Sequence, residues 1–491
     1  MQGLNKEENK KIVTMLQETH KLYDENIESW QYYRMSYEGG PEFIQQSLIQ
    51  HPRESIENYK ARLEKGICIN YCQSIVDLFN FFLTDDPPLR EIETINTNSI
   101  EYKRFLNFLD DADLNGNSYD FFLNETHRLS SVYGTMGILI DKPQYENDAK
   151  DESCYPYAAA YSPEAILDWE IERDHRTGRR YLTYLKLKDG EDYLLFWIDR
   201  WERWKIDIKA GEEEVAIKIA SGINPLNEIA FIWLPNVRVF GSYNMGISDI
   251  SDLSYIASSI IRDFSRADEI LDIAGFPMMR MPMETEDALE NETSPEITVS
   301  ERSVLEFNPE FGDSAKPDWL ESRIKEAIES ILLIQDRKIE EAYRIMFLSG
   351  VYENRDKAQT KSATALRYQY QQLNALLIKK SKALIHADMK ILQLFFKWQN
   401  ISLSKPDIKI TRPEDFALGA LVESLANAVT GLQEIKSKTF RFITKKNMIN
   451  LLHPNLSEKD YNVISEELKN EVALEESALI EEEKLRITTA K

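Results

Sequence analysis

The sequence predicts an α+β protein that is mainly helical and carries an antiparallel β-sheet as an insert. Over most of the 491 residues, apolar side chains recur with the helical period of about 3.6 residues. Between about residue 136 and residue 235 the period changes to about 2, which is typical of strands. A long helical pattern at 361–398 then follows without any Gly or Pro. A chain of this length is expected to hold two or more domains.

Helical segments are expected before the sheet. Residues 5–35 carry apolar side chains at spacings of three and four, and a Gly-Gly-Pro sequence at 39–41 interrupts the pattern. A second segment is expected at 55–83, where an Asp-Asp-Pro-Pro sequence closes it. Residues 101–134 are expected to be helical in two pieces that separate near 115–116.

The insert is expected to be an antiparallel meander. Its segments alternate or run apolar and are rich in β-branched and aromatic residues. Asp-Gly at 189–190 and Ala-Gly at 210–211 stand between segments as hairpin turns. The expected strands are 181–188, 193–199, 204–208 and 215–220.

Helix returns after the sheet. We expect a helix at 248–275, then short β-like pieces around an acidic loop at 284–296, and a second helix at 319–348. A polar, charged loop follows at 352–360.

The longest helix, at 361–398, would span roughly 57 Å at about 1.5 Å per residue. Residues 406–410 are expected to be a strand that returns to the earlier sheet. From 415 to the end, the sequence is helical in pattern and acidic.

The composition excludes several classes of protein. The net charge is −24, which argues against a conventional nucleic-acid binder, because such proteins neutralise phosphates with Lys and Arg. We expect no signal peptide and no membrane span, because no basic region leads into an apolar stretch and no long apolar window occurs. The three cysteines fit a reducing compartment without a disulfide framework.

No enzyme motif is present, so we expect no catalytic site, no cofactor and no metal. The phosphate loop, the dinucleotide fingerprint, the zinc-protease motif and the nucleophile elbow are all absent, and the six histidines are dispersed. Asp111, Asp113 and Asn115 match the opening half of a calcium loop, but Phe122 stands where the bidentate Glu should be. A polar turn between helices is the expected reading, and whether an ion binds at Asp111 and Asp113 stays open.

Two further positions have a simple structural interpretation. Cys68 and Cys72 are spaced to share a helix face, but two ligands without partners are more often small buried hydrophobes. His386 lies among apolar neighbours in the longest helical pattern, so we expect it in the core or at an interface.

Several segments resemble a known family. Tyr33–Gly40 (YRMSYEGG), His51–Ser55 (HPRES), Arg62 and Asn70-Tyr71 look like the amino-terminal region of a group of tailed-bacteriophage portal proteins, and Tyr133–Asp141 (YGTMGILID) resembles the start of the portal wing sheet. The order of helix, acidic β-containing insert, helix, charged loop and very long helix is also similar to that family. The resemblance covers most of residues 30–410 and depends mainly on element order.

The resemblance implies a portal-like division of the chain. In the terms of that family, the segments are a wing at 1–247, a stem helix at 248–275, a clip at 276–318, a second stem helix at 319–348, a tunnel loop at 349–360, a tunnel helix with a return strand at 361–413, and a helical crown at 414–491.

The resemblance also implies a function. A portal is a non-enzymatic ring, typically of twelve copies, at one capsid vertex of the virion, and it is assembled in the host cytoplasm. Double-stranded DNA passes through its channel non-specifically during packaging and ejection. Its expected partners are further copies of itself, the large terminase subunit, the head-tail adaptor, and the major capsid and scaffolding proteins. No membrane is involved.

Two sets of site residues follow from the resemblance. Residues 275–320 hold eleven acidic and three basic side chains, a net charge of −8 (11 − 3), so this surface would repel DNA phosphates over a Debye length of about 8 Å. The loop after the second stem helix would touch the DNA backbone through its cations. The clip residues are Met279, Met281, Met283, Glu284, Glu286, Asp287 and Glu290, and the tunnel-loop residues are Arg355, Lys357 and Lys361.

Alternatives stay open at this point. The clip segment is otherwise an acidic insertion without a partner, and the charged loop is otherwise solvated and outside any channel. For the whole chain, the alternative is another phage or cytoplasmic structural adaptor without a DNA channel. A metal-dependent or nucleotide-driven enzyme is a third class, which no motif supports.

Overall fold

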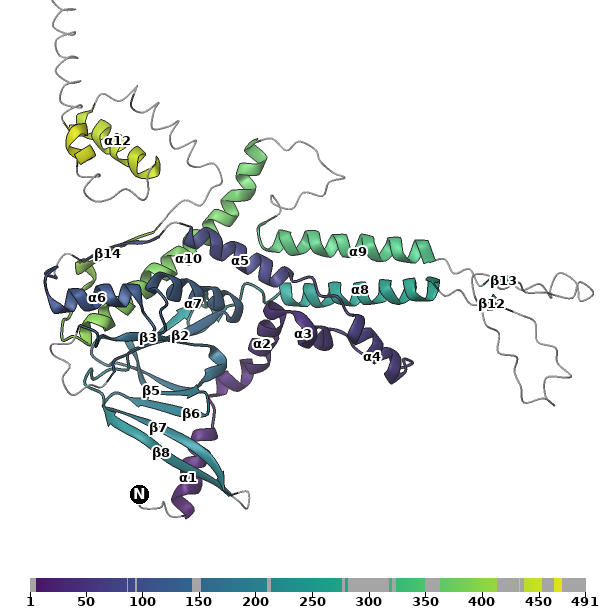
Figure 1. Cartoon of the computed structure of the whole chain (residues 1–491), viewed down its shortest axis with the longest axis horizontal. Coiled ribbons are helices and arrows are strands. Elements are labelled where there is room, and N and C mark those ends of the chain that lie inside the picture. The colour runs from purple at the N-terminus through teal and green to yellow at the C-terminus, as the bar shows by residue number, and fades with distance from the viewer. Residues whose placement is uncertain are drawn as a thin grey trace, which may run out of the picture. The chain divides into compact units, whose positions relative to one another are not determined.

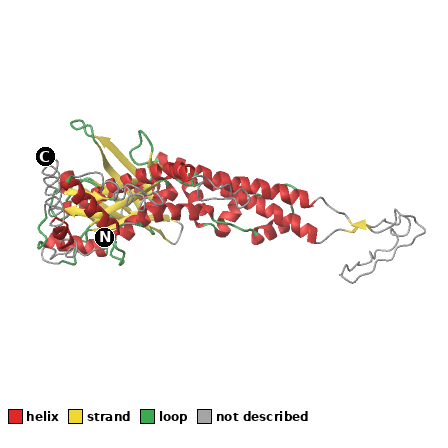
Figure 2. Ribbon diagram, turned by 90° about the horizontal axis from the view of Figure 1, so that it is seen from above, coloured by secondary structure: helices red, strands yellow, loops and turns green. Residues whose placement is uncertain are grey.

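The computed structural model describes most of the chain, which divides into two compact units. Unit 1 comprises residues 1–360 and 379–412, and unit 2 comprises residues 361–378 and 413–491. Helices and antiparallel sheets both occur, so the α+β class is confirmed (Figure 2). The described residues are 6–85, 87–92, 95–143, 152–209, 213–275, 279–280, 318–319, 324–348, 363–412, 432, 437–452 and 463–469.

The amino-terminal helices are more numerous than the apolar pattern indicated. The predicted helical segment 5–35 consists of two helices, α1 (Lys6–Gln17) and α2 (Lys21–Glu38). The second helix begins after His20, which is its N-cap and accepts a hydrogen bond from the Leu22 amide. A separate helix, α3 (Gly40–Ser47), begins at the predicted breaker.

The predicted helix at 55–83 is likewise two helices, α4 (Ile56–Lys65) and α5 (Tyr71–Thr84). Asn70 caps α5 by accepting from the Gln73 amide, and it donates to the carbonyl oxygen of Tyr37 at 2.6 Å. The expectation of one helix was wrong because Gly66 is the C-cap of α4 and Asn70 is the N-cap of α5.

The two-piece helix before the sheet is confirmed as α6 (Ile100–Asp110) and α7 (Tyr119–Tyr133). Ser99 and Ser118 cap them by accepting from the amides of Tyr102 and Phe121. Gly134, with φ of +88°, ends α7 in the left-handed conformation that favours glycine.

The four expected strands are confirmed within one antiparallel meander, and further strands form a second sheet. The three-stranded sheet has the order β3-β2-β9, and the five-stranded sheet is the antiparallel meander β4-β5-β6-β7-β8 (Figure 1). The predicted turn at 189–190 joins β5 to β6, whereas the predicted turn at 210–211 lies outside the described residues. The strands are β2 (Thr135–Asp141), β3 (Tyr157–Tyr161), β4 (Ile166–Arg173), β5 (Arg180–Asp189), β6 (Asp192–Trp197), β7 (Arg200–Lys209), β8 (Glu213–Ile223) and β9 (Phe231–Pro235).

Apolar packing joins α1 and α2 to the five-stranded sheet. Val13 and Leu16 of α1 pack on Leu195, Trp204 and Ala216. A second cluster around Trp169 lies between the two sheets and α2. The fully buried Lys186 of β5 donates to the carbonyl oxygens of Met15 and Glu18, so an ammonium group satisfies the carboxyl end of α1.

After a short hairpin of β10 (Val237–Arg238) and β11 (Gly246–Ile247), unit 1 continues into a projecting pair of helices. The first is α8 (Leu253–Gly275) and the second is α9 (Ile324–Ile345). They run side by side in opposite directions, and the short strands β12 (Met279–Arg280) and β13 (Asp318–Trp319) pair beyond their ends (Figures 1 and 2). The predicted pair of helices around a β-containing insert is therefore present.

The longest helix is α10 (Ala363–Lys397), as the absence of Gly and Pro predicted. The return strand is present as β14 (Ile408–Thr411), but it pairs with β1 (Leu89–Ile92) and not with the earlier sheet, so that part of the expectation was wrong. In unit 2, α12 (Lys438–Leu452) and the helical residues 463–469 confirm helix within the predicted crown segment. Among the described residues, no helix is long and apolar enough to cross a membrane.

Candidate assembly surface

A largely buried ion pair joins the two helices of the projecting pair. The two helices are joined by Lys338 of α9, which donates to the hydroxyl of Ser259 at 2.7 Å and to the carboxylate of Asp263. The Asp263 side chain is only 7% exposed. Because the ion pair is largely screened from water, it fixes the register of α9 against α8.

Three consecutive apolar residues of α9 are exposed, and the middle one, Leu333, lies on the helix side opposite the buried Gln335. The consecutive residues Leu332, Leu333 and Ile334 are 47%, 71% and 53% exposed. Gln335, Ala342 and Met346, which follow at helical spacing, are buried. Single exposed leucines are ordinary, but a run of large apolar side chains on a projecting helix is typical of an interaction surface.

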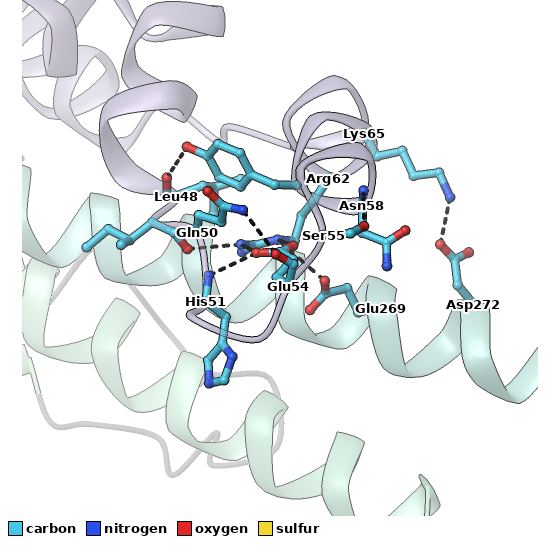
Figure 3. Close-up of polar contacts among 12 residues, drawn as sticks. Leu48, Gln50, His51, Glu54, Ser55, Asn58, Arg62, Lys65, Glu269 and Asp272 are labelled. Atoms are coloured by element: carbon cyan, nitrogen blue, oxygen red, sulfur yellow. Dashed lines mark hydrogen bonds and ion pairs between the residues drawn. The ribbon is translucent and has the colours of Figure 1, made fainter.

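The HPRES segment and Arg62, which carried the family resemblance, hold α4 against α8 (Figure 3). Arg62 donates through two nitrogens to Glu54, at 2.9 and 2.7 Å, and also to the carbonyl oxygen of Ile49. It forms a further ion pair with Glu269 of α8 at 3.4 Å. The hydrogen bonds from Arg62 hold the pKa of Glu54 below its usual range, so this carboxylate stays ionised.

A second ion pair extends the contact between α4 and α8. Lys65 lies 2.6 Å from Asp272, and both side chains are more than half exposed (Figure 3). Such an exposed pair contributes little stability by itself. Together with the Arg62–Glu269 pair, however, it aligns α4 along α8.

The YRMSYEGG segment joins α2 to its neighbours. Arg34 forms an ion pair with Glu164 at 3.1 Å, and the Tyr37 hydroxyl donates to Asp77 at 2.9 Å. Gly39 has φ of +67°, and a Cβ there would lie 2.8 Å from the side-chain nitrogen of Asn70. Glycine is therefore required by both the conformation and the close approach.

Two buried charge clusters at α10 were missed by the sequence reasoning. In the first, Lys380 is fully buried and donates to Asp249 and Asn236. Burial lowers the pKa of the Lys380 ammonium, and the carboxylate of Asp249 opposes that shift. The pair ties α10 to the segment that leads into α8.

His127 of α7 lies beside this cluster. Its ring is buried, and neither ring nitrogen has a hydrogen-bond partner among the described residues. Burial lowers the pKa of His127 well below its usual range, and the charges of Lys380 and Arg412 lower it further. The imidazole is therefore neutral at pH 7.

The second cluster surrounds Asp388, whose side chain is 0% exposed. Arg90 of β1 donates to it at 2.9 Å, the Tyr119 hydroxyl also donates at 2.9 Å, and Arg412 lies 3.6 Å away. Burial raises the pKa of the Asp388 carboxyl, and the two guanidinium groups oppose the rise. The pairing of β1 with β14 brings the two arginines to this one acid.

A signal for both clusters was present in the sequence. Lys380 and Asp388 lie on the same stripe of α10 as the buried Leu377, Leu384 and Ile391. Charged residues within an apolar stripe are buried only when they are paired, so their positions indicated partners elsewhere in the chain.

The predicted clip and tunnel-loop sites are not described. Met279 lies in β12, but nothing is described of its side chain, and Met281, Met283, Glu284, Glu286, Asp287 and Glu290 lie outside the described residues. The same holds for Arg355, Lys357 and Lys361. These residues stay predictions.

The predicted polar turn at 111–116 is confirmed. Asp113 accepts from the amide of Asn115, and Asp111 accepts from the amide of Gly116. Phe122, at the position of the missing ligand, is buried. No group of three or more metal-binding side chains occurs in the described part of the chain.

The cysteines have the expected environments, but His386 does not lie in the core. Cys72 is fully buried, and burial raises the pKa of its thiol to about 12. Cys68 is partly buried, whereas His386 is exposed in the single chain, so the expectation of a core position for it was wrong and an interface position stays a prediction. Partial desolvation raises the pKa of Cys68 and lowers that of His386.

Comparisons with known proteins identify no family. No protein-family model matches the chain, and no curated protein matches it. Among solved structures, the chain is similar to one from the neck of an empty GTA particle computed with C6 symmetry, at 11% identity over 76% of this chain and 89% of that chain, with a TM-score of 0.41. It is also similar to a chain from the virion of a native gene transfer agent particle, at 10% identity over 83% of this chain and 98% of that one, with a TM-score of 0.40.

Proposed function

We propose that the protein is a structural subunit of a portal-type ring, which surrounds double-stranded DNA as it enters and leaves a phage-like capsid. The observation that carries the proposal is the projecting α8–α9 pair with the exposed Leu332, Leu333 and Ile334. Burying these apolar side chains against another subunit would be favourable, because it removes apolar surface from water.

The element order supports the same proposal. A sheet-containing region is followed by α8, the paired β12 and β13, α9 and the long α10, and then by β14, which returns to β1. This order agrees with the wing, stem, clip, second stem and tunnel-helix order that the family resemblance implies. The HPRES segment and Arg62 hold α4 on the first stem helix, which is a purely structural role.

The charge of the chain supports a channel that passes DNA without holding it. Residues 275–320 carry a net charge of −8 (11 − 3), as counted above. If this segment faces the channel, like-charge repulsion limits adhesion of the phosphates. Arg355, Lys357 and Lys361 would then supply the transient contacts to the DNA backbone.

The proposed partners are those of a ring at a capsid vertex of the virion. The methionines and carboxylates at 279–290 are proposed to dock the packaging terminase and then the head-tail adaptor, because methionine side chains adapt to more than one partner. Major capsid and scaffolding proteins complete the set. The chain itself is proposed to be non-enzymatic.

Light scattering with mass resolution, followed by negative-stain microscopy of the purified chain, tests the proposal. A portal of twelve copies of this 57.2 kDa chain is expected to give annular particles with a central hole. Leu333→Ser is expected to reduce the assembled fraction without changing the far-ultraviolet circular dichroism. A wild-type chain that stays monomeric at tens of micromolar, with and without a scaffolding protein, would refute the ring and favour the adaptor without a channel.

A further inference from the structure

We infer that neighbouring copies meet through α9 of one copy and α4 of the next. This inference rests on the proposed ring, and it assigns the two helix faces that form the contact. Its basis is the position of both helices on α8, the heights at which their residues lie, and the charges that they present.

The two helices lie on opposite sides of α8. Asp263 of α8 faces α9, because it accepts from Lys338. Asp272 faces α4, because it pairs with Lys65. At about 100° per residue, these two positions of α8 differ by roughly half a turn. The helices therefore form a row, α4–α8–α9, in agreement with Figure 1.

Among the described residues of unit 1, both ends of the row carry exposed apolar side chains. At one end, Leu333 points away from α8 and is 71% exposed. At the other end, α4 has no buried residue, and Ile56 is 65% exposed. A row with different exposed faces at its two ends is suited to a head-to-tail contact, which closes into a ring when the rotation between copies permits it.

The heights of the two faces match. Arg62 of α4 is level with Glu269 of α8. Lys338 of α9 is level with Asp263 of α8, because the two side chains are paired. Glu269 lies six residues further along α8, and α9 runs in the opposite direction with the same rise per residue. The residue of α9 level with Glu269 is therefore six positions before Lys338, which is Leu332. Copies related by rotation about an axis along the helices would therefore set α4 of one against the Leu332–Ile334 run of the other.

One pair of charges at matching heights is complementary. By the same count, Glu57 of α4 is level with Arg337 of α9, and both side chains are exposed on the outward faces. Lys60, also outward and exposed, is level with the apolar run, where its aliphatic stem can cover Leu333 while the ammonium stays in water. A second copy of this chain is thus the occupant that fits the α9 face.

Cross-linking tests the contact. In a Cys68→Ser background, Lys60→Cys combined with Leu333→Cys is treated with a short bifunctional maleimide and analysed on denaturing gels. We expect a ladder of dimers, trimers and larger species from the double variant. Each single variant, which lacks one half of the contact, is expected to give no ladder. The remaining cysteines, Cys72 and Cys154, are buried.

The outcomes separate this inference from the proposed function. If the double variant forms annular particles but no ladder, the α4–α9 contact is wrong and the ring stands. If Leu333→Cys alone gives covalent dimers, like faces meet and the head-to-tail contact is wrong. If neither the wild type nor any variant assembles, the ring itself is wrong.

A charge exchange gives a second readout that does not depend on added cysteines. Glu57→Arg and Arg337→Glu, each alone, are expected to raise the subunit concentration for half-assembly by about twofold to fivefold, because each sets like charges opposite one another. The combination is expected to restore the wild-type value. Additive losses in the combined variant would overturn the pairing of these two residues.

Discussion

Replacement of Lys380 by methionine tests whether buried charges hold α10 in place. The substitution keeps most of the side-chain volume and removes the ammonium. Asp249, whose side chain is 6% exposed, would then be a buried carboxylate that keeps only its hydrogen bond from Asn236, at 2.8 Å. Removing one partner of a buried ion pair typically costs about 3–5 kcal/mol. We expect a loss of that size in the free energy of unfolding.

A second substitution separates the lost ion pair from lost packing. Asp249→Asn added to Lys380→Met removes the unpaired charge, so we expect the double variant to regain on the order of 2–3 kcal/mol. Lys379→Met is the matched control, because Lys379 is the exposed neighbour of Lys380 on the same helix. A surface substitution of this kind is expected to change stability by less than about 0.5 kcal/mol.

The assay is urea denaturation followed by circular dichroism. The protein concentration is kept too low for the subunits to assemble. The midpoint and the slope are compared among the four proteins, because a change of slope would indicate a change in the cooperativity of unfolding. The reasoning is refuted if Lys380→Met loses less than about 1 kcal/mol, or if the double variant is no more stable than the single one.

Three further predictions concern other buried or paired groups. The pKa of His127 is lowered in the folded chain, so below about pH 6.5 only the unfolded state binds a proton at this residue. As the pH falls, the free energy of unfolding should therefore decrease by up to about 1.4 kcal/mol per pH unit, until the folded state is protonated as well. His127→Gln should show a smaller difference in urea midpoint between pH 7.5 and pH 5.5, and an unchanged difference would contradict this. Arg62→Met should speed hydrogen exchange in α4 by about tenfold, whereas Lys65→Met, which breaks only an exposed pair, should change it little. Asp388→Asn should lower the free energy of unfolding, measured with heat or urea, by about 2–4 kcal/mol, because two buried guanidinium groups lose their anion. A near-neutral effect would show that water reaches these groups.

Short-range signals explain which parts of the fold were predictable. The long helix at 363–397 followed from a run without Gly or Pro, and the strands followed from a period of 2 with a Gly turn at 190. The helix pair around 276–318 followed from its apolar stripes and from the family resemblance. For the long helix and the strands, the pattern of neighbouring residues alone specifies the element.

Other features depended on partners distant in the sequence. Asn70 begins α5 and its side-chain amide donates to the distant carbonyl oxygen of Tyr37, whereas the end of α4 is marked locally by Gly66. The strand at 408–411 was placed on the wrong sheet because period identifies a strand but does not choose its neighbour.

The residue pattern by itself determined the class of the fold, the helix pair, the long helix and the absence of known enzyme motifs, since all of these are local. Tertiary structure alone decided that Lys380 meets Asp249, that Arg90 and Arg412 share Asp388, and that α4 and α9 lie on opposite sides of α8. The physical reason is that the free energy of a buried charge depends on the groups that surround it in space, and those groups come from segments far apart in the chain.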